Sequence, residues 1–334
     1  MLKSFIFFFV YLSVKKKRKR KAEKMSKPYA IGVDLGGTNL RVALVSQEGE
    51  VVKKIKEPST GLAGGDVIRL LKNAIDQLIS PDVKGIGIGV AGVLDREENR
   101  IAMSPNIPPL TGFSFNEFHY PVPLYVENDA NAAALGEACA GAGRDFKNFV
   151  LMTLGTGIGG GIIYGGKLLK MAAEVGHMSI VADGKKCFCG NNGCLELFSS
   201  ARAIIAAVIE ALEGGAESLL RECCEGKIYR ITPEDVYKAA FEEGDNLSRE
   251  VLREAGRYLG VGIANIINIA SPEAVILAGG LIGSWNIYVD EAIKEASKRA
   301  FKSLSQKVSI IPASLGDEAG IVGAASLVFN PPAE

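Results

Sequence analysis

Apolar positions along the chain alternate between the period of a buried strand and the period of a helix. Residues 83–90 alternate glycine with apolar side chains, which is typical of a buried strand that another backbone approaches closely. Residues 66–79 carry apolar side chains at helical spacing. Further strands are predicted at 29–33, 40–45, 51–55, 122–126, 149–154, 162–164, 274–277 and 308–311, and further helices at 130–140, 201–212, 233–241, 248–270, 288–301 and 318–329. This alternation predicts a mixed α/β protein, and its length allows two domains.

Composition and charge narrow the class of protein. Of 334 residues, 48% are hydrophobic and 39 are glycine, so we expect a large core and many tight turns. The formal net charge is zero, but residues 1–24 hold nine Lys or Arg and one Glu, which leaves about −8 on the remainder. An acidic body binds nucleic acid poorly, so no nucleic-acid partner is expected.

The N-terminal segment, residues 1–24, combines an apolar run, Ser4–Val14, with a basic run, Lys15–Lys21. The apolar run is too short to span a bilayer, and a signal peptide carries its main positive charge ahead of the apolar run. We therefore favour a translation start at Met25, which makes residues 1–24 an over-extended, non-native segment; tethering to membrane lipids is the alternative. No later stretch is apolar enough to cross a membrane, so we expect a soluble, cytoplasmic body without a membrane partner.

The densest candidate chemistry lies between Glu174 and Glu196. One histidine and three cysteines fall within 18 residues of each other there, a set that suits a tetrahedral Zn²⁺: His177, Cys187, Cys189 and Cys194. Four protein ligands predict a closed, structural site. A disulfide is the less favoured alternative, because the first two thiols are too close in sequence for a relaxed bridge. The metal would fix the imidazole and the two flanking glutamates in place.

Two glycine-rich turns each join a pair of predicted strands. Asp34 precedes the first, Gly36-Gly37-Thr38, and the second is Gly155-Thr156-Gly157. Backbone N–H groups at such a tip can cradle phosphate, and Asp34 could hold Mg²⁺ through water, although an ordinary hairpin turn is an equally good interpretation. Gly155 to Gly160 also fits the dinucleotide-binding pattern, but that pattern requires a following helix, and a strand is predicted there. Gly161 to Lys167 nearly matches a phosphate-binding P-loop, but Leu168 stands where the P-loop needs Ser or Thr. Two such hairpins suggest duplicated domains facing one nucleotide.

Two further polar positions have open interpretations. Asp129 stands between a predicted strand and a predicted helix, where it would serve as a helix cap or as a general base oriented by Asn128. Asn106, in the Ser104–Pro108 loop, would bind a sugar hydroxyl or form an Asx turn.

Together these motifs resemble the ROK family (repressors, open reading frames and sugar kinases), and most of all its bacterial glucokinases. The resemblance covers residues 27–329 and rests on five motifs in order: DLGGTN from Asp34, VENDAN from Val126, LGTGIGGG from Leu154, EVGH with CFCGNNGCLE from Glu174, and ILAGG from Ile276. It implies the actin-like, ribonuclease-H-like α/β fold with an interdomain cleft. The small domain would comprise 27–129 with about 315–330, and the large domain 130–314 with the zinc-binding loop.

The resemblance also implies an activity and roles for single residues. It implies ATP-dependent phosphorylation of glucose, with Mg²⁺, a structural Zn²⁺ and a homodimeric or homotetrameric assembly. Asp129 would be the general base. The sugar would be bound by Asn106, Asn128, Asp129, Glu174, His177 and Glu196, and the nucleotide and Mg²⁺ by Asp34, Gly36, Gly37, Thr38, Gly155, Thr156, Gly157, Gly279 and Gly280.

Three alternatives remain at this stage. The acceptor could be mannose, fructose, N-acetylglucosamine or N-acetylmannosamine, and the donor could be polyphosphate. A transcriptional repressor of this family needs a helix-turn-helix domain ahead of Asp34, where only 33 residues stand, so this function is disfavoured.

Overall fold

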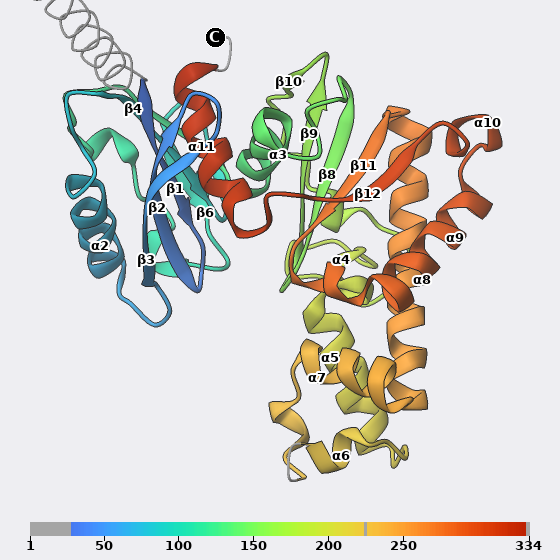
Figure 1. Ribbon diagram of the computed structural model, residues 1–334. Coiled ribbons are helices and arrows are strands. Elements are labelled where there is room, and N and C mark those ends of the chain that lie inside the picture. The colour runs from blue at the N-terminus through green and yellow to red at the C-terminus, as the bar shows by residue number, and fades with distance from the viewer. Residues whose placement is uncertain (1–27, 224–225, 332–334) are drawn as a thin grey trace, which may run out of the picture. The chain divides into compact units, whose positions relative to one another are not determined.

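The computed structural model describes residues 28–223 and 226–331 (Figure 1). The apolar and basic N-terminal segment lies outside these residues. The chain forms two compact units, one running up to Glu127 and resuming at Ala324, the other comprising Asn128–Gly323. No helix within the described part of the chain is long and apolar enough to cross a membrane.

The first unit is built on a five-stranded sheet with the order β3-β2-β1-β4-β7. The first three strands pair antiparallel, and β4 pairs parallel to β1. Helix α2 (Gly64–Asp76) packs against this sheet, and the hairpin of β5 and β6 follows β4. The strands are β1 (Tyr29–Leu35), β2 (Asn39–Ser46), β3 (Val51–Pro58), β4 (Val83–Val90), β5 (Val93–Asp95), β6 (Arg100–Met103) and β7 (Leu124–Asn128).

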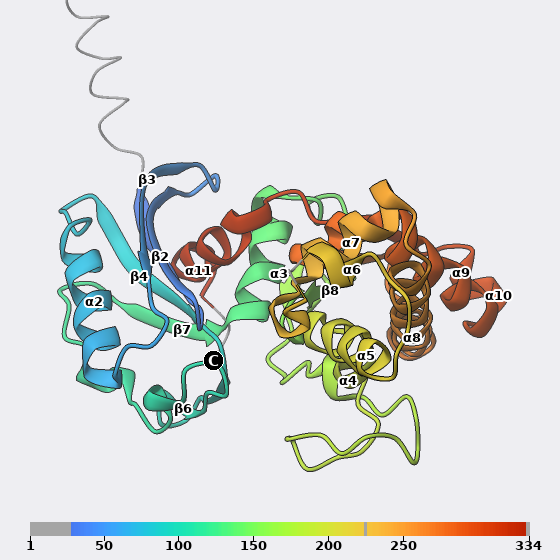
Figure 2. The same ribbon diagram turned by 90° about the horizontal axis from the view of Figure 1, so that it is seen from below.

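The alternating glycines of β4 let helix α11 (Ala319–Phe329) lie directly on the strand. Ile86 and Ile88 join the core that α2 covers. The glycines between them face the other way, and a Cβ on Gly87 would lie 1.7 Å from the carbonyl oxygen of Ala324. The close backbone approach predicted from the sequence is confirmed, and α2 and α11 lie on opposite faces of the sheet (Figure 2).

The second unit repeats this plan in a sheet with the order β10-β9-β8-β11-β12. Strands β8 and β9 pair antiparallel around the second glycine turn, and β11 is parallel to both β8 and β12. The duplication suggested by the two glycine turns is therefore present in the topology. The strands are β8 (Phe149–Leu154), β9 (Ile158–Tyr164), β10 (Lys167–Leu168), β11 (Ala274–Ala278) and β12 (Ser309–Pro312).

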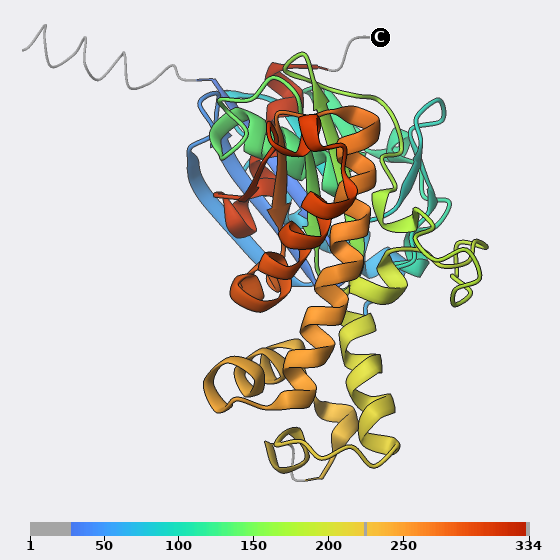
Figure 3. The ribbon, with the colours of Figure 1, turned by 90° about the vertical axis from the view of Figure 1, so that its right-hand side faces the viewer.

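Alternation along β8 divides the side chains of the second unit between two cores. Phe149 and Leu151 pack with α3 (Asp129–Ala140), while Val150 and Met152 pack in the larger core with α8 (Asn246–Ala270). Figure 3 shows α8 running beside α5 and α9. The remaining helices are α4 (Glu196–Ser199), α5 (Ala201–Glu213), α6 (Leu220–Cys223), α7 (Pro233–Lys238), α9 (Asp290–Arg299) and α10 (Lys302–Ser305).

Several boundaries differ from the sequence prediction. Strand β1 runs to Leu35, two residues past its predicted end, so Asp34 lies within the strand and pairs in register with Arg41 of β2. Strand β9 begins at Ile158, four residues early, so its glycines belong to the strand; Cβ atoms on Gly159 and Gly161 would meet α3. The helices predicted at 233–241 and 288–301 each adjoin a π-helical turn, at Ala239–Glu243 and Trp285–Val289.

Candidate functional site

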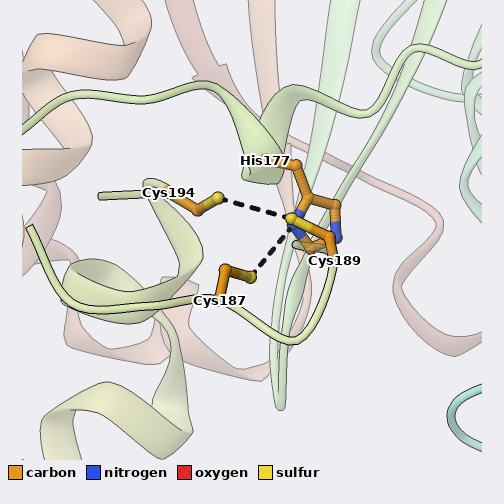
Figure 4. A group of neighbouring side chains, drawn as sticks. All are labelled: His177, Cys187, Cys189 and Cys194. Carbon is orange, nitrogen blue, oxygen red and sulfur yellow. Dashed lines mark hydrogen bonds between the residues drawn. The ribbon is translucent and has the colours of Figure 1, made fainter. Parts of the chain in front are cut away.

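Four side chains of the second unit converge on one point (Figure 4). The ligand atoms of His177, Cys187, Cys189 and Cys194 all lie within 4.8 Å of one another. The imidazole comes from a 3₁₀ turn, Val175–His177, and the thiols from the loop that leads into α4. The four residues singled out by spacing are therefore one cluster in space.

The distances in this cluster agree with a tetrahedral zinc site. Two sulfurs about 2.3 Å from a shared centre at the tetrahedral angle would be about 3.8 Å apart, and a sulfur and an imidazole nitrogen about 3.6 Å apart. The Cys189 and Cys194 sulfurs are 3.7 Å apart, and the Cys187 sulfur is 3.6 Å from His177 Nδ1. The sulfur separation is far longer than the roughly 2 Å bond of a disulfide. The donor set and its spacing therefore fit Zn²⁺, with Nδ1 of the imidazole directed into the cluster.

Backbone conformations that suit glycine allow the loop to fold around these ligands. Gly190 and Gly193 have φ of 94° and 68°, in the left-handed region. A Cβ on Gly193 would lie 1.7 Å from the carbonyl oxygen of Val181, so no larger residue fits there. The Asn191 amide donates to the carbonyl of His177 and ties the thiol loop to the imidazole turn. The loop is thus partly organised by its own backbone and side-chain bonds.

The thiols differ in proton affinity. Burial raises the pKa of Cys194 to about 12, while a backbone N–H of Asn191 lowers the pKa of the exposed Cys189. Thiolates are the form that binds zinc, so metal binding here requires loss of the Cys194 proton.

The flanking Glu174 lies near the imidazole of His177 and near Glu196. Burial raises the pKa of the Glu174 carboxyl, with the charge of His177 acting to lower it and that of Glu196 to raise it. Glu196 accepts a hydrogen bond from the backbone N–H of Ile158 at 2.8 Å. The cluster, both carboxylates and the start of β9 therefore form one local group.

The second glycine turn lies at the carboxyl ends of two adjacent parallel strands. Gly155 to Gly157 follow β8, and Gly279 follows β11 with a φ of 94°. A Cβ on Gly279 would lie 2.3 Å from the carbonyl oxygen of Leu154, so the glycine segment after β11 packs against the end of β8. The side chain of Arg202, on α5, donates to the carbonyl of Thr156 at 3.2 Å. Ligands of α/β proteins collect at such strand ends.

The first unit contributes the other glycine turn. Asp34 accepts a hydrogen bond from Arg41 Nη1 at 2.9 Å, and both side chains are largely buried. A Cβ on Gly37 would lie 2.7 Å from the carbonyl oxygen of Asn106, so the turn and the Ser104–Pro108 loop pack together. That loop is braced by the hydroxyl of Ser104, which donates to the carbonyl of Ala91 at 2.6 Å. The Asn106 side chain itself is exposed.

The helix cap expected near Asp129 is supplied by its neighbour. The side-chain oxygen of Asn128 accepts from the backbone N–H groups of Ala130 and Asn131 at 2.9 and 3.2 Å. Asp129 is the first residue of α3 and accepts from Ala130 at 2.9 Å. Since Asn128 is the N-cap, the alternative interpretation of Asp129 as the cap residue is wrong.

Two arginines beside these motifs were not found from the sequence. Arg41 contacts Asp34, and Arg96 holds the buried Glu127 with two hydrogen bonds, 2.6 and 2.7 Å long. The second pair is 31 residues apart in the chain, and no local pattern marks it. The signal that the sequence offered was Glu127 itself: an acid next to an apolar strand is expected to be buried, and a buried carboxylate needs a cationic partner.

A mixed α/β structure with two duplicated units of this kind defines the actin-like ATPase fold. The sequence profile described as the ROK family matches residues 30–330. Over 316 residues the chain is 34% identical to a glucokinase of Streptomyces coelicolor, covering 90% of this chain and 98% of that protein. It is also 32% identical to a xylose repressor of Caldicellulosiruptor bescii, covering 90% of this chain and 78% of the repressor.

A solved structure agrees with these relatives. A ROK family glucokinase from Streptomyces griseus, in complex with glucose and AMPPNP, is 32% identical, with a TM-score of 0.77 and coverage of 90% and 99% of the two chains. The chain belongs to the ROK family. The resemblance stated from the five motifs and the predicted actin-like fold with two domains are confirmed.

Proposed function

We propose that this protein is an ATP-dependent sugar kinase that transfers a phosphoryl group to the 6-hydroxyl of glucose. The observation that carries the proposal is the grouping of Glu174 and Glu196 with His177, which belongs to the His/Cys cluster that fits Zn²⁺. A phosphatase or an ATPase without an acceptor has no need of three such side chains fixed together. The relatives named glucokinase, and the glucose and AMPPNP bound by one of them, support the same activity.

In this proposal the metal cluster is a scaffold for sugar binding. The four ligands would hold Zn²⁺, which supplies rigidity and takes no part in the reaction. His177, held through Nδ1, would present Nε2 to a sugar hydroxyl. Glu174 and Glu196 would accept hydrogen bonds from further hydroxyls, and the side-chain amides of Asn106 and Asn128 would donate to sugar oxygens. A sugar lacking one of these hydroxyls would cover a polar group without satisfying it, which gives specificity.

Asp129 is proposed to act as the general base. It would accept the proton of the sugar 6-hydroxyl as the oxygen attacks the γ-phosphorus, and ADP would leave. Asn128 supplies the cap of α3, and Asp129 is the first residue of that helix. The main tasks are positioning and stabilisation of charge, as in other phosphoryl transfers.

The glycine turns are proposed to hold the nucleotide. Gly36, Gly37 and Thr38 with Gly155, Thr156 and Gly157 would surround the phosphates, and Gly279 and Gly280 would lie on the adenosine side. Mg²⁺ would neutralise charge on the transferred group. Because Arg41 already contacts Asp34, we propose that this carboxylate holds the ion through water and not directly.

The test is ADP release by the purified protein with MgATP and each of five sugars: glucose, mannose, fructose, N-acetylglucosamine and N-acetylmannosamine. Strong glucose-dependent release is expected. Activity on another sugar alone would keep the kinase and change its acceptor. No ADP release with any of the five sugars, together with no sugar phosphate formed when polyphosphate replaces ATP, would contradict the proposal.

A sugar-binding transcriptional regulator is the second candidate, because a xylose repressor is among the relatives. The chain spans nearly the whole of the glucokinase relative and about three quarters of the repressor. Sugar binding measured by calorimetry without any transfer would favour the regulator.

A further inference from the structure

The pair of Arg96 and Glu127 lies beside the proposed base without belonging to the substrate-binding set. Glu127 is the fourth residue of β7, and its side chain is 1% exposed. Arg96 directly follows β5 and meets both carboxylate oxygens, Nη1 on Oε2 at 2.6 Å and Nη2 on Oε1 at 2.7 Å. This two-pronged geometry is the strongest form of an arginine–carboxylate contact.

Glu127 needs this contact because its carboxylate is buried. A buried carboxylate is costly unless it is paired and hydrogen-bonded, and removal of one partner of a buried pair leaves an uncompensated charge. Lysine cannot replace the two parallel N–H donors of a guanidinium. The position of Glu127, and of the strand end that carries it, therefore depends on Arg96.

The pair also lies where the chain passes from one unit to the other. Glu127 is the last residue of the first unit, and Asn128 is the first of the second. Asn128 caps α3, and Asp129 opens that helix. Glu127 and Asp129 are thus separated by a single residue in the chain, the N-cap of α3.

We propose that Arg96 is a positioning residue for phosphoryl transfer: it clamps Glu127 and thereby fixes the orientation of Asp129. This inference rests on the proposed kinase function. A general base must lie within hydrogen-bond reach of the proton it removes, and a displacement of about 1 Å can cost about 100-fold in rate. Loss of the clamp should therefore act on kcat and leave KM for sugar and ATP nearly unchanged.

The same hairpin offers a matched control. Arg100, at the start of β6, pairs with Asp95 and Glu98 at 3.0 and 2.9 Å, and its side chain is 39% exposed against 37% for Arg96. Both are arginines of one hairpin with carboxylate partners and nearly equal exposure. They differ in that the partners of Arg100 are not buried and belong to the hairpin itself.

The experiment compares kcat, both KM values and the melting temperature of wild type, Arg96→Ala, Arg96→Lys and Arg100→Ala. We expect Arg96→Ala to lose at least tenfold in kcat with KM values within threefold, Arg96→Lys to recover part of the loss, and Arg100→Ala to stay within twofold of wild type. If Arg96→Ala does not fold, Arg96→Lys with Glu127→Gln supplies the same comparison, and each should lose at least threefold in kcat.

The outcomes separate the inference from the function on which it rests. A folded Arg96→Ala with wild-type kcat, or equal losses in the Arg96 and Arg100 variants, would overturn the positioning role while the kinase stands. A loss confined to KM would assign Arg96 to binding and also overturn it. A wild-type protein without sugar-dependent ADP release would remove both.

Discussion

The carboxylate of Glu196 accepts a hydrogen bond from the backbone N–H of Ile158 at 2.8 Å. This contact joins the end of the metal loop to the first residue of β9, 38 positions earlier. The neighbouring Gly157 makes room for it, since a Cβ there would lie 2.3 Å from the same carboxylate oxygen. The proposed phosphate turn and a proposed sugar ligand are thus in direct contact.

Substitution of Gly157 by Ala should therefore displace Glu196. We expect an at least tenfold weaker affinity for glucose, because the carboxylate must leave the Ile158 N–H, and a loss of about 1–3 kcal/mol in the free energy of unfolding from overpacking. Calorimetric titration with glucose and thermal unfolding measure the two effects.

Gly283 is the control for this variant, because an added Cβ there meets nothing within 4 Å. Gly283→Ala should bind glucose as the wild type does. Unchanged glucose affinity in Gly157→Ala would show that Glu196 does not bind the sugar from this position.

Features that depend on local pattern were readable in the sequence. Strands β4 and β8 were predicted to the residue, because apolar runs bounded by turns mark buried strands. The four metal-site residues were found together because their ligand types and spacing leave few alternatives. The glycines of β4 even indicated that another backbone would approach, and α11 does so at Gly87.

Features that depend on distant neighbours were not readable. The partner of Glu127 lies 31 residues away, and that of Asp34 lies across a hairpin. The π-helical turn Trp285–Val289 packs against Gly256 of α8, where a Cβ would lie 2.3 Å from the Tyr288 carbonyl; helical periodicity alone does not reveal such a contact. In each case tertiary packing, and not local propensity, decides the conformation.

Removal of one thiol should empty the metal site. Cys187→Ser replaces a buried ligand, and we expect zinc, measured by elemental analysis, to fall from about one per chain to near zero. Binding of structural zinc is worth roughly 10 kcal/mol in small domains, so the loop should lose order and the glucose KM should rise.

Cys139 provides the matched control, since it is a free thiol on α3 outside the cluster. Cys139→Ser should keep its zinc and its KM. Full zinc content in Cys187→Ser, with a normal KM, would contradict the scaffold role of the cluster.

Zinc binding should release protons. Burial raises the pKa of Cys194 to about 12, so in the metal-free protein this thiol is protonated at neutral pH and must lose its proton to bind zinc. The affinity for zinc should therefore fall as the pH falls and rise as the pH rises. Calorimetry in buffers of different ionisation enthalpy counts the protons, and a count of zero at pH 7 would contradict this assignment of ligands.

The sharpest test of the mechanism is Asp129→Asn. The asparagine oxygen can still accept from the Ala130 N–H, and Asn128 still caps α3, so the fold and the zinc content should be retained. An amide cannot take the proton of the sugar hydroxyl, so kcat should fall by about 10²–10⁴-fold, with KM for glucose and ATP changed much less.

Asp66, an acid in the first turn of α2, is the control: Asp66→Asn should keep wild-type kcat. A folded, zinc-loaded Asp129→Asn that still transfers phosphate at near the wild-type rate would remove Asp129 from the mechanism. The same result would remove the basis for a positioning role of Arg96, because the clamp on Glu127 would then orient no reacting group.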